Sequence, residues 1–336
     1  MCIRDRCITA NIKHPDGRQL IKDLVPQVDV VLENFSPGTL ADNGLGSDIL
    51  CELNPRLIYA AGTGYGGSGP YRDYLGMDIT LQAMSGVMSV TGDVDSPPTK
   101  AGAAFCDILG GAHLYAGIVS ALYQREQTGK GAVIDISMQD CVFPALATQL
   151  GTYFQLGHQP ARTGNRHSGM ALAPYNVYQA KDGHVAMICF RGEHWLRLCD
   201  AMGRPELKTD ARFARTKDRV RNMDEVDALV EAWTRTLTKA EIFAIAQSAG
   251  MICAPVQTLE DVVNDPQLLA RGTLAWAEDK WGDQSLKFHT PIRFKGMQTP
   301  RVPDMPGLGA HSEAVLLEFL GIHANEVARL RDAQAI

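Results

Sequence analysis

The chain has 336 residues, of which 45% are hydrophobic and 21% charged, and 32 basic against 38 acidic side chains give a formal net charge of -6. This composition is typical of a soluble globular protein of about two domains, and it excludes a disordered or collagen-like chain. The acidic balance argues against nucleic-acid binding, which needs a basic surface to displace counterions from phosphates.

Neither a membrane span nor a metal site is predicted. The longest uncharged stretch, residues 141–161, contains two prolines and several amides, so we expect a buried segment and not an anchor. The first residues mix charge into every turn and include no apolar core of a secretory signal, which favours the cytoplasm. The eight cysteines form no C-x-x-C pair and no cluster with histidine, so we expect reduced thiols.

The first 140 residues alternate between apolar runs and helical periodicity, which predicts βαβ units and hence a parallel sheet. The periodicity at residues 77–90 is interrupted by Gly86, and the helix after Asp107 closes at Gly129. The predicted strands are residues 7–12, 28–32, 57–61, 101–106 and 133–137, and the predicted helices are residues 18–25, 77–90 and 108–127. Asp140 is expected to cap a further helix.

The pattern changes after Arg162, where a polar, glycine-containing stretch reads as an exposed linker. A hairpin turning at Asp182-Gly183 and several helices follow, which predicts a smaller α+β domain. Thr238 and Glu241 form a capping box. The second half is expected to contain a hairpin of residues 175–179 and 184–190, helices at 192–202, 223–237 and 239–247, a second hairpin of residues 274–277 and 285–288, a return segment at 291–294 and two short helices from Ser312. The domain boundaries are placed at 7–140 with 290–336 (large domain), 141–169 (linker helix and loop), 170–265 (small domain) and 266–289 (return linker with hairpin).

One glycine pattern points to a function that its surroundings exclude. Gly62, Gly64 and Gly67 fit G-x-G-x-x-G after a strand, as in a dinucleotide-binding turn. That turn must open a helix that holds the pyrophosphate, whereas residues 68–71 continue a loop. The chain also lacks a Walker A sequence and a G-x-S-x-G nucleophile elbow, so nicotinamide binding, phosphoryl transfer and hydrolase chemistry are not supported.

Asp107 is the leading candidate for chemistry. It stands between an apolar run and a predicted helix, with Gly110 and Gly111 in the first turn. A helix N-cap is the structural interpretation of an Asp in this place. The positive end of the helix also keeps a carboxylate ionised, and small neighbours leave room for a ligand, so the same group is a candidate covalent nucleophile.

Asp78 and the pair Asn34-Phe35 are the next candidates. Asp78 is either a solvated loop carboxylate or part of a site. Asn34 and Phe35 follow the predicted strand at 28–32, and ligands of open α/β sheets bind at the carboxyl ends of strands. His113 lies on the apolar helix after Asp107 and is interpreted as a core residue rather than a base.

Taken together, these segments resemble the class III CoA-transferase family, also called the CaiB/BaiF or formyl-CoA transferase-like family. The segments that carry the resemblance are VDVVLENFSPGTL at 28–40, residues 57–70, MDITLQAMSG at 77–86, residues 100–131, VIDISMQD at 133–140, PYNVYQAKDGHVAM at 174–187 and PGLGAHSEAVLLEFLG at 306–321. By this resemblance Asp107 corresponds to the catalytic aspartate, and Lys13, Asn34, Phe35 and Asp78 to positions around the CoA pantetheine and thioester.

The resemblance implies a CoA transfer between an acyl-CoA and a free carboxylic acid, through an aspartyl mixed anhydride and an aspartyl-CoA thioester on Asp107. Coenzyme A is then a substrate and not a bound cofactor, and one thioester is exchanged for another without ATP or metal. We add the hypothesis that Gly110, Gly111 and the helix start offer N–H groups to the tetrahedral oxyanions.

Two departures from the family pattern narrow the expected reaction and its acceptor. α-Methylacyl-CoA racemases of the same family use a histidine directly before the residue matching Asp78, and here that residue is Met77, which cannot accept a proton. Transfer is therefore favoured, with racemase or isomerase as the alternative. Oxalate-using formyl-CoA transferases carry a run of glycines where this chain has residues 165–170, so another small carboxylate or dicarboxylate is expected as the acceptor.

The resemblance also implies architecture and assembly. It predicts a Rossmann-like large domain built from both chain ends, a smaller α+β middle domain and an interlocked homodimer. The family begins with a further strand-helix-strand segment, which carries an arginine for the CoA phosphates and a glutamine near the thioester, and this chain joins the pattern at about Cys7. An N-terminally truncated fragment is therefore expected, and an inactive remnant is the third interpretation.

Overall fold

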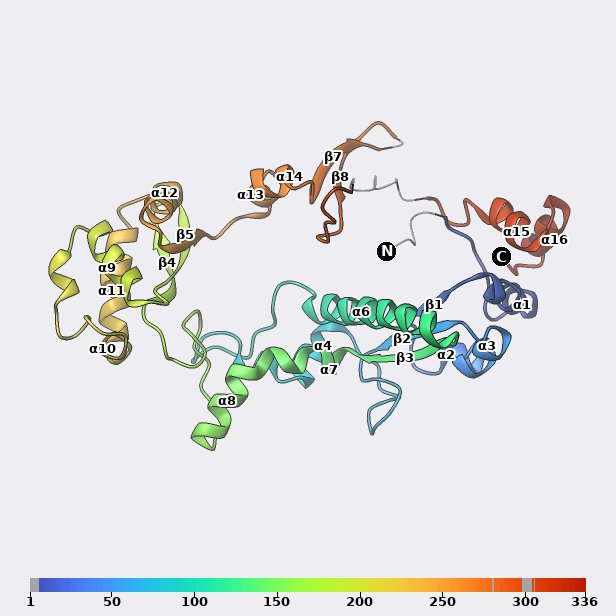
Figure 1. Ribbon diagram of the computed structural model, residues 1–336, viewed down its shortest axis with the longest axis horizontal. Coiled ribbons are helices and arrows are strands. Elements are labelled where there is room, and N and C mark those ends of the chain that lie inside the picture. Colours follow the sequence, from blue (N-terminus) through green and yellow to red (C-terminus); the bar gives the residue numbers. More distant parts are fainter. Residues whose placement is uncertain (1–5, 280, 298–303, 305) are drawn as a thin grey trace. The chain divides into compact units, whose positions relative to one another are not determined.

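Two units make up the chain in the computed structural model, which describes residues 6–279, 281–297, 304 and 306–336 (Figure 1). The first unit contains the described residues up to Ser85, residues 102–144 and those from Pro266 onward, and the second contains residues 86–101 and 145–265. The predicted large domain falls in the first unit except for residues 86–101. Residues 145–169, predicted as a linker, group with the second unit, and residues 266–289 group with the first.

The first unit is built on a parallel sheet with the strand order β1-β2-β3, which confirms the α/β fold class. In register, Val30 of β1 pairs with Ile58 of β2, and Ile58 pairs with Ala132 of β3. The long helix α6 packs on β2 and β3 (Figure 1). The elements of this unit are α1 (Pro15–Leu24), η2 (Val25–Gln27), β1 (Val30–Glu33), α2 (Thr39–Asp42), α3 (Ser47–Leu53), β2 (Ile58–Thr63), α4 (Asp78–Met84), α6 (Phe105–Thr128), β3 (Ala132–Ser137), α7 (Met138–Val142), α14 (Pro266–Ala270), β7 (Leu274–Glu278), β8 (Gln284–Phe288), α15 (Ser312–Leu320) and α16 (Ala324–Asp332).

Two predicted strands are absent, and a predicted cap is displaced. Residues 7–12 lie against the C-terminal segment, where the Asn11 amide donates to the Ala335 carbonyl at 2.8 Å and the His311 amide donates to the Cys7 carbonyl at 2.9 Å. Residues 101–104 form a loop, and α6 already begins at Phe105. An apolar run becomes a strand only where a neighbouring strand pairs with it, which periodicity alone cannot show. The cap of α7 is Ser137, whose hydroxyl accepts from the Asp140 amide at 3.2 Å.

The second unit is a three-stranded antiparallel sheet, β4-β5-β6, packed with helices, as predicted for an α+β fold. One large apolar cluster forms its core, with Trp195, Val226 and Ile242 fully buried. The predicted hairpin and the capping box of Thr238 and Glu241 are both confirmed. Its elements are α5 (Val87–Val90), α8 (Ala147–Leu156), β4 (Tyr175–Ala180), β5 (Gly183–Ile188), α9 (Gly192–Ala201), η4 (Pro205–Lys208), α10 (Thr216–Arg221), α11 (Met223–Thr234), α12 (Lys239–Ala249), β6 (Ile252–Pro255) and α13 (Leu259–Val263), while η3 (Phe143–Leu146) crosses the boundary between the units.

The segment predicted to be buried, residues 141–161, is largely exposed beyond Leu146. Helix α8 contains no buried residue, and Phe154 on it is 77% exposed. Among the described residues, the one helix long and apolar enough to cross a membrane is instead α6, which packs on the sheet of the first unit. The loop after α8, predicted as an exposed linker, is tied to α11, because Arg166 pairs with Asp224 at 2.6 Å and with Asp227 at 2.7 Å.

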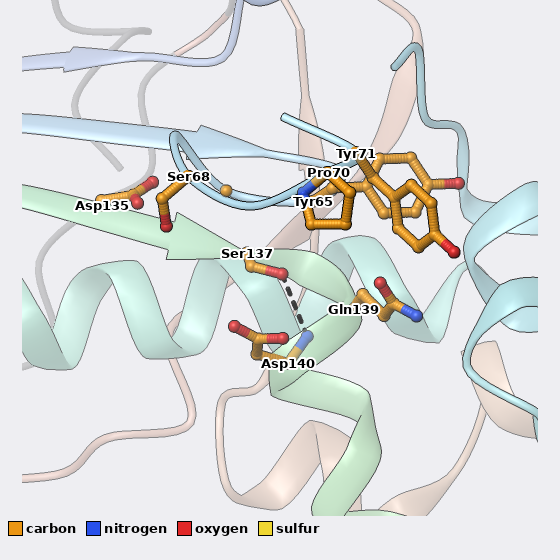
Figure 2. Close-up of a pocket in the computed structure, with 9 residues that line it drawn as sticks. Tyr65, Ser68, Pro70, Tyr71, Asp135, Ser137, Gln139 and Asp140 are labelled. Carbon is orange, nitrogen blue, oxygen red and sulfur yellow. Dashed lines mark hydrogen bonds between the residues drawn. The ribbon is translucent and has the colours of Figure 1, made fainter. Parts of the chain in front are cut away.

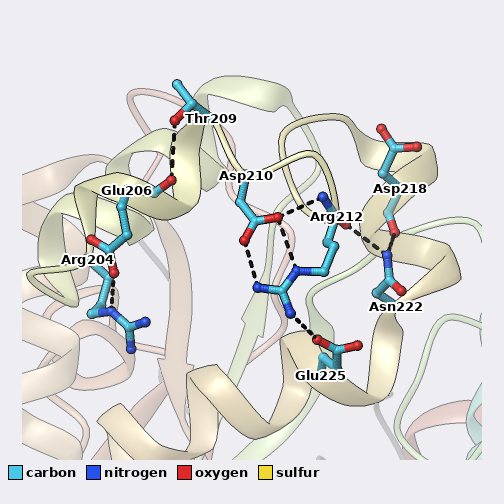
Figure 3. A network of polar contacts seen from close by, with 8 residues as sticks. All are labelled: Arg204, Glu206, Thr209, Asp210, Arg212, Asp218, Asn222 and Glu225. Carbon is cyan, nitrogen blue, oxygen red and sulfur yellow. Dashed lines mark hydrogen bonds and ion pairs between the residues drawn. The ribbon is translucent and has the colours of Figure 1, made fainter.

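A polar network borders α10 and α11 in the second unit (Figure 3). Arg212 pairs with Asp210 at 2.7 Å and with Glu225 at 2.8 Å, and the side chain of Asn222 donates to the Arg212 carbonyl at 3.0 Å. Arg204 pairs with Glu206. Exposed ion pairs of this kind contribute little to stability, so the apolar core carries most of the stability of this unit.

Candidate active site

Asp107 is the third residue of α6, and its side chain is exposed at the surface of the first unit. The prediction that it is the N-cap is therefore wrong, because the cap position belongs to Ala104, which offers no side-chain hydrogen bond. A carboxylate in the first turn still faces the positive end of the helix. The exposed position leaves Asp107 accessible to a ligand.

The start of α6 lies at the carboxyl edge of the parallel sheet. Helix α6 leads through a short turn into β3, and Gly110 in its second turn approaches Met138, which follows the end of β3. Asn34, directly after β1, lies at the same edge, where its side chain donates to the carbonyl of Gly62 in β2. Ligands of α/β sheets bind at this edge.

Asp78 is bonded to the helix that carries Asp107. As the first residue of α4, Asp78 accepts a hydrogen bond from the backbone amide of Cys106 at 2.9 Å. The other carboxylate oxygen accepts from the side chain of Gln82 at 2.6 Å, and Gln82 is fully buried. The structure therefore places the Asp78 carboxylate at the first turn of α6, against the residue that precedes Asp107.

Partial desolvation of the Asp107 carboxyl, which is still exposed, and the charge of the nearby Asp78 carboxylate raise the pKa of Asp107 above its usual value. The positive end of the helix, which predicts an ionised carboxylate, would by itself lower this pKa. The pKa of Asp107 is raised instead, so desolvation and the Asp78 charge outweigh the effect of the helix end. Burial and the charge and hydrogen bond of Asp78 raise the pKa of the neighbouring Cys106 thiol to about 11. Cys106 therefore stays protonated at neutral pH, and a thiol in that state is a poor nucleophile.

The two glycines predicted as oxyanion donors in the first turn lie in the second turn of α6. There each backbone N–H group donates to the carbonyl four residues before it, so the amides of Gly110 and Gly111 are not free for an oxyanion. A Cβ on Gly110 would lie 2.7 Å from Cγ of Met138, so this glycine permits close packing. A Cβ on Gly111 would meet nothing within 4 Å, and Gly111 lies one turn after Asp107 on the same helix face.

Phe35, Lys13 and His113 are all exposed. Phe35 is 50% exposed, and its amide donates to the Glu33 carboxylate at 2.8 Å. Lys13 is exposed in the turn before α1, and its ammonium group has no hydrogen-bond partner in the described part of the chain. His113, predicted as a core residue, is exposed and bonds through Nδ1 to the Leu109 carbonyl at 2.8 Å.

A hollow of about 270 Å³ opens at the carboxyl ends of β2 and β3 (Figure 2). The residues that line it are Tyr65, Gly66, Ser68, Pro70, Tyr71, Asp135, Ser137, Gln139 and Asp140. None of them was predicted from the sequence as a site residue, although Asp140 was predicted as a helix cap. The sequence signal that could have identified these residues is their position at the carboxyl ends of two predicted parallel strands, where ligands of α/β sheets bind. Asp135 and Asp140 give the hollow a negative charge, which disfavours an anionic acyl-CoA or carboxylate.

The model of the CoA-transferase family III matches residues 5–312, nearly the whole chain. The chain belongs to this family. Acetyl-CoA:oxalate CoA-transferase from Acetobacter aceti is 37% identical over 314 residues, covering 93% of this chain and 79% of that protein. Succinyl-CoA--D-citramalate CoA-transferase from Chloroflexus aurantiacus is 35% identical over 335 residues, covering 98% and 82%. These matches identify the chain as a transferase enzyme of family III.

Solved structures agree with this assignment. The crystal structure of a CaiB/BaiF family protein from Brucella suis matches this family III chain with a TM-score of 0.81 at 36% identity, covering 93% of this chain and 81% of that one. The resemblance stated from the sequence motifs and the mixed α/β fold are both confirmed.

Proposed function

We propose that the chain transfers CoA from an acyl-CoA to a free carboxylate, with the Asp107 carboxylate as the covalent nucleophile. The observation that carries this proposal is the exposed Asp107 in the first turn of α6, beside a glycine that leaves open space above it. The family supports the reaction type. The neighbouring thiol of Cys106 is buried and protonated, so the carboxylate is the competent nucleophile at this place.

The reaction has four acyl-transfer steps. The Asp107 carboxylate attacks the thioester carbonyl, which forms a mixed anhydride and releases CoA thiolate. The thiolate attacks the aspartyl carbonyl, the donor acid leaves, and an aspartyl-CoA thioester remains. The acceptor carboxylate then attacks this thioester, which forms a second anhydride and again releases CoA thiolate. Attack of that thiolate on the acceptor carbonyl gives the new acyl-CoA and restores Asp107.

Coenzyme A is a substrate in this scheme, and no separate cofactor takes part. We assign Lys13, Asn34 and Phe35 to the CoA-binding surface, as the family resemblance implies. Asn34 stands at the carboxyl edge of the sheet, Phe35 presents an exposed ring, and the free ammonium of Lys13 suits a phosphate or the pantetheine amides. For Gly111 we propose that it keeps open the approach to Asp107.

The acceptor is proposed to be a small carboxylate or dicarboxylate. The two relatives named above act on oxalate and on D-citramalate, as their names state. In this chain Arg166 pairs with Asp224 and Asp227 of α11, and residues 165–170 lack the run of glycines found in oxalate-using formyl-CoA transferases. Because of that missing run, we rank dicarboxylates other than oxalate first.

The test is a transfer assay on the full chain. Acetyl-CoA or succinyl-CoA is mixed with a panel of small carboxylates, and the new acyl-CoA is measured by chromatography. Asp107→Asn should lower the rate by at least about a thousandfold, because the amide cannot form the anhydride. Hydroxylamine added during turnover should leave a hydroxamate on Asp107, read by mass spectrometry. An unmodified Asp107 during active transfer would overturn the mechanism.

The same samples distinguish the alternatives. Proton exchange at the α-carbon of an acyl-CoA in deuterated water, without any acceptor, would indicate a racemase. Met77, which is 71% exposed at the start of α4, offers no proton acceptor for that reaction. Absence of both activities would indicate a chain that keeps the fold but has lost catalytic activity.

We also propose a cytoplasmic homodimer. Apolar side chains on the outer face of α6, including Ile108, Tyr115 and Tyr123, are more than half exposed, and a second subunit would bury them. Acyl-CoA molecules carry several charges and do not cross membranes unaided, which favours the cytoplasm. Analytical ultracentrifugation should give twice the chain mass of 36.5 kDa, and a monomer at micromolar concentration would contradict the dimer.

A further inference from the structure

Asp78 makes a long-range contact to the first turn of α6. The first-turn amides of Phe105 and Ile108 donate to the nearby carbonyls of Ala103 and Ala104, at 3.0 and 3.2 Å. The amide of Cys106 instead donates to Oδ1 of Asp78, 28 residues away in sequence, at 2.9 Å. An acceptor for such an amide usually comes from the N-cap side chain, and Ala104 has none to offer.

Asp78 is itself held in place on two sides. Its Oδ2 accepts from Nε2 of the fully buried Gln82, one turn later in α4, at 2.6 Å. The loop before α4 lies against the end of β2, because a Cβ on Gly64 would come within 3.0 Å of Cα of Gly76. The side chain of Leu81 fills the same contact and is fully buried. A chain of close contacts thus runs from β2 through α4 to Cys106.

Asp107 directly follows Cys106, so whatever fixes the Cys106 amide also fixes the Asp107 backbone. We propose that Asp78 is a positioning residue, whose carboxylate anchors the first turn of α6 and sets the place and charge environment of Asp107. This inference rests on the proposed function and deepens it. It differs from the role that the family resemblance gives Asp78, a direct contact around the CoA thioester.

Two consequences follow from the geometry. The anchor needs an acceptor atom at Oδ1, which Asn supplies and Ala does not. The electrostatic effect on Asp107 requires an ionised carboxylate at position 78, which Asn lacks. The negative charge of Asp78 contributes to the raised pKa of Asp107, so removing it lowers that pKa. The reaction needs ionised Asp107, so the acid limb of the pH-rate profile should follow the Asp107 pKa downward.

The experiment compares Asp78→Asn, Asp78→Ala and the wild-type chain in the transfer assay from pH 4 to 9. Asp78→Asn should keep the plateau kcat within about threefold and move the acid limb to lower pH. Asp78→Ala should lower kcat by about a hundredfold, a loss that a displacement near 1 Å can cause, with the KM for acyl-CoA changed less than about threefold. Asp73→Asn is the control, because Asp73 is 78% exposed in the loop before α4 and, within the described residues, forms an ion pair only with the adjacent Arg72.

Two readouts on the free protein keep this test separate from the assay. Peptide hydrogen exchange over residues 105–110 should be faster in Asp78→Ala and unchanged in Asp78→Asn. Carbon-13 titration of the Asp107 carboxyl should show a lower pKa in Asp78→Asn. If wild type transfers no CoA, the proposed function fails while these readouts still decide the anchoring role. A raised KM with unchanged kcat in Asp78→Ala, or an unmoved acid limb in Asp78→Asn, overturns the inference.

Discussion

Arg219 is a fully buried guanidinium in the second unit, and it is held mainly by backbone groups. It donates to the carbonyls of Ala173 and Phe213, each at 2.8 Å, and to the hydroxyl of Thr216 at 3.1 Å. Its guanidinium also lies 5.1 Å from the ring centre of Trp195. Burial lowers the pKa of Arg219 below its usual value, yet the hydrogen bonds satisfy the charge. The side chain therefore joins the segment before β4 to the start of α10.

Replacing this residue should destabilise the second unit. Arg219→Ala leaves two buried carbonyls without a donor and opens a cavity beside Trp195, so we expect the free energy of unfolding to fall by about 3 kcal/mol. Arg221→Ala is the matched control at the end of the same helix, because Arg221 is 74% exposed and lies 3.8 Å from Asp218. Its effect should stay within about 0.5 kcal/mol in urea unfolding followed by Trp fluorescence. Equal losses in the two variants would contradict this account of Arg219.

At the scale of elements, the sequence predicts those whose signal is local. The apolar runs at 28–32, 57–61 and 133–137 are confirmed as β1, β2 and β3, and Gly86 does separate two helices, because its φ of 87° is left-handed. The strands expected at 7–12 and 101–106 are absent, since a strand depends on a neighbour elsewhere in the chain. The sequence predicts Asp107 as a candidate, because it stands between an apolar run and a helix with two glycines. The sequence does not predict the contact of Asp78 with Cys106, because no local pattern indicates a hydrogen bond between residues 28 positions apart.

The two adjacent glycines of α6 allow a paired test of packing against access. Ala in place of Gly stabilises a helix interior by about 0.8 to 1 kcal/mol. Gly111→Ala should show this gain, because its Cβ meets no atom within 4 Å, whereas Gly110→Ala should lose stability, because its Cβ would come within 2.7 Å of Met138. Gly111→Ala should nevertheless lower kcat/KM at least severalfold, since its methyl group stands on the Asp107 face. Urea unfolding and the transfer assay measure the two effects, and full activity in Gly111→Ala would reject the access role.

At the scale of the whole molecule, the two units differ in how their apolar residues are grouped. The second unit has one large buried cluster, which joins its sheet to α9, α11 and α12. Among the described residues of the first unit there are two smaller clusters, one around Leu45, Leu50 and Leu57 and one that joins Leu20 of α1 to Leu316 and Leu330 of α15 and α16. Other buried residues of this unit, such as Ile58 and Leu81, belong to neither cluster. A larger contiguous core buries more apolar surface, so the second unit should be the more stable.

This difference predicts that unfolding of the chain has two steps, which the four tryptophans can separate. Trp195 is buried in the core of the second unit and Trp233 packs against it, while Trp276 in β7 of the first unit is 48% exposed. The shift of Trp emission toward longer wavelength therefore reports mainly the second unit, whereas far-UV circular dichroism reports the helices of both. In a urea titration the dichroism signal should begin to fall at lower urea than the emission shift. Arg219→Ala should move the emission transition to lower urea and leave the first part of the dichroism change in place. Coincident transitions by both probes would mean that the two units unfold together. The difference in how their apolar residues are grouped would then give the two units no difference in stability.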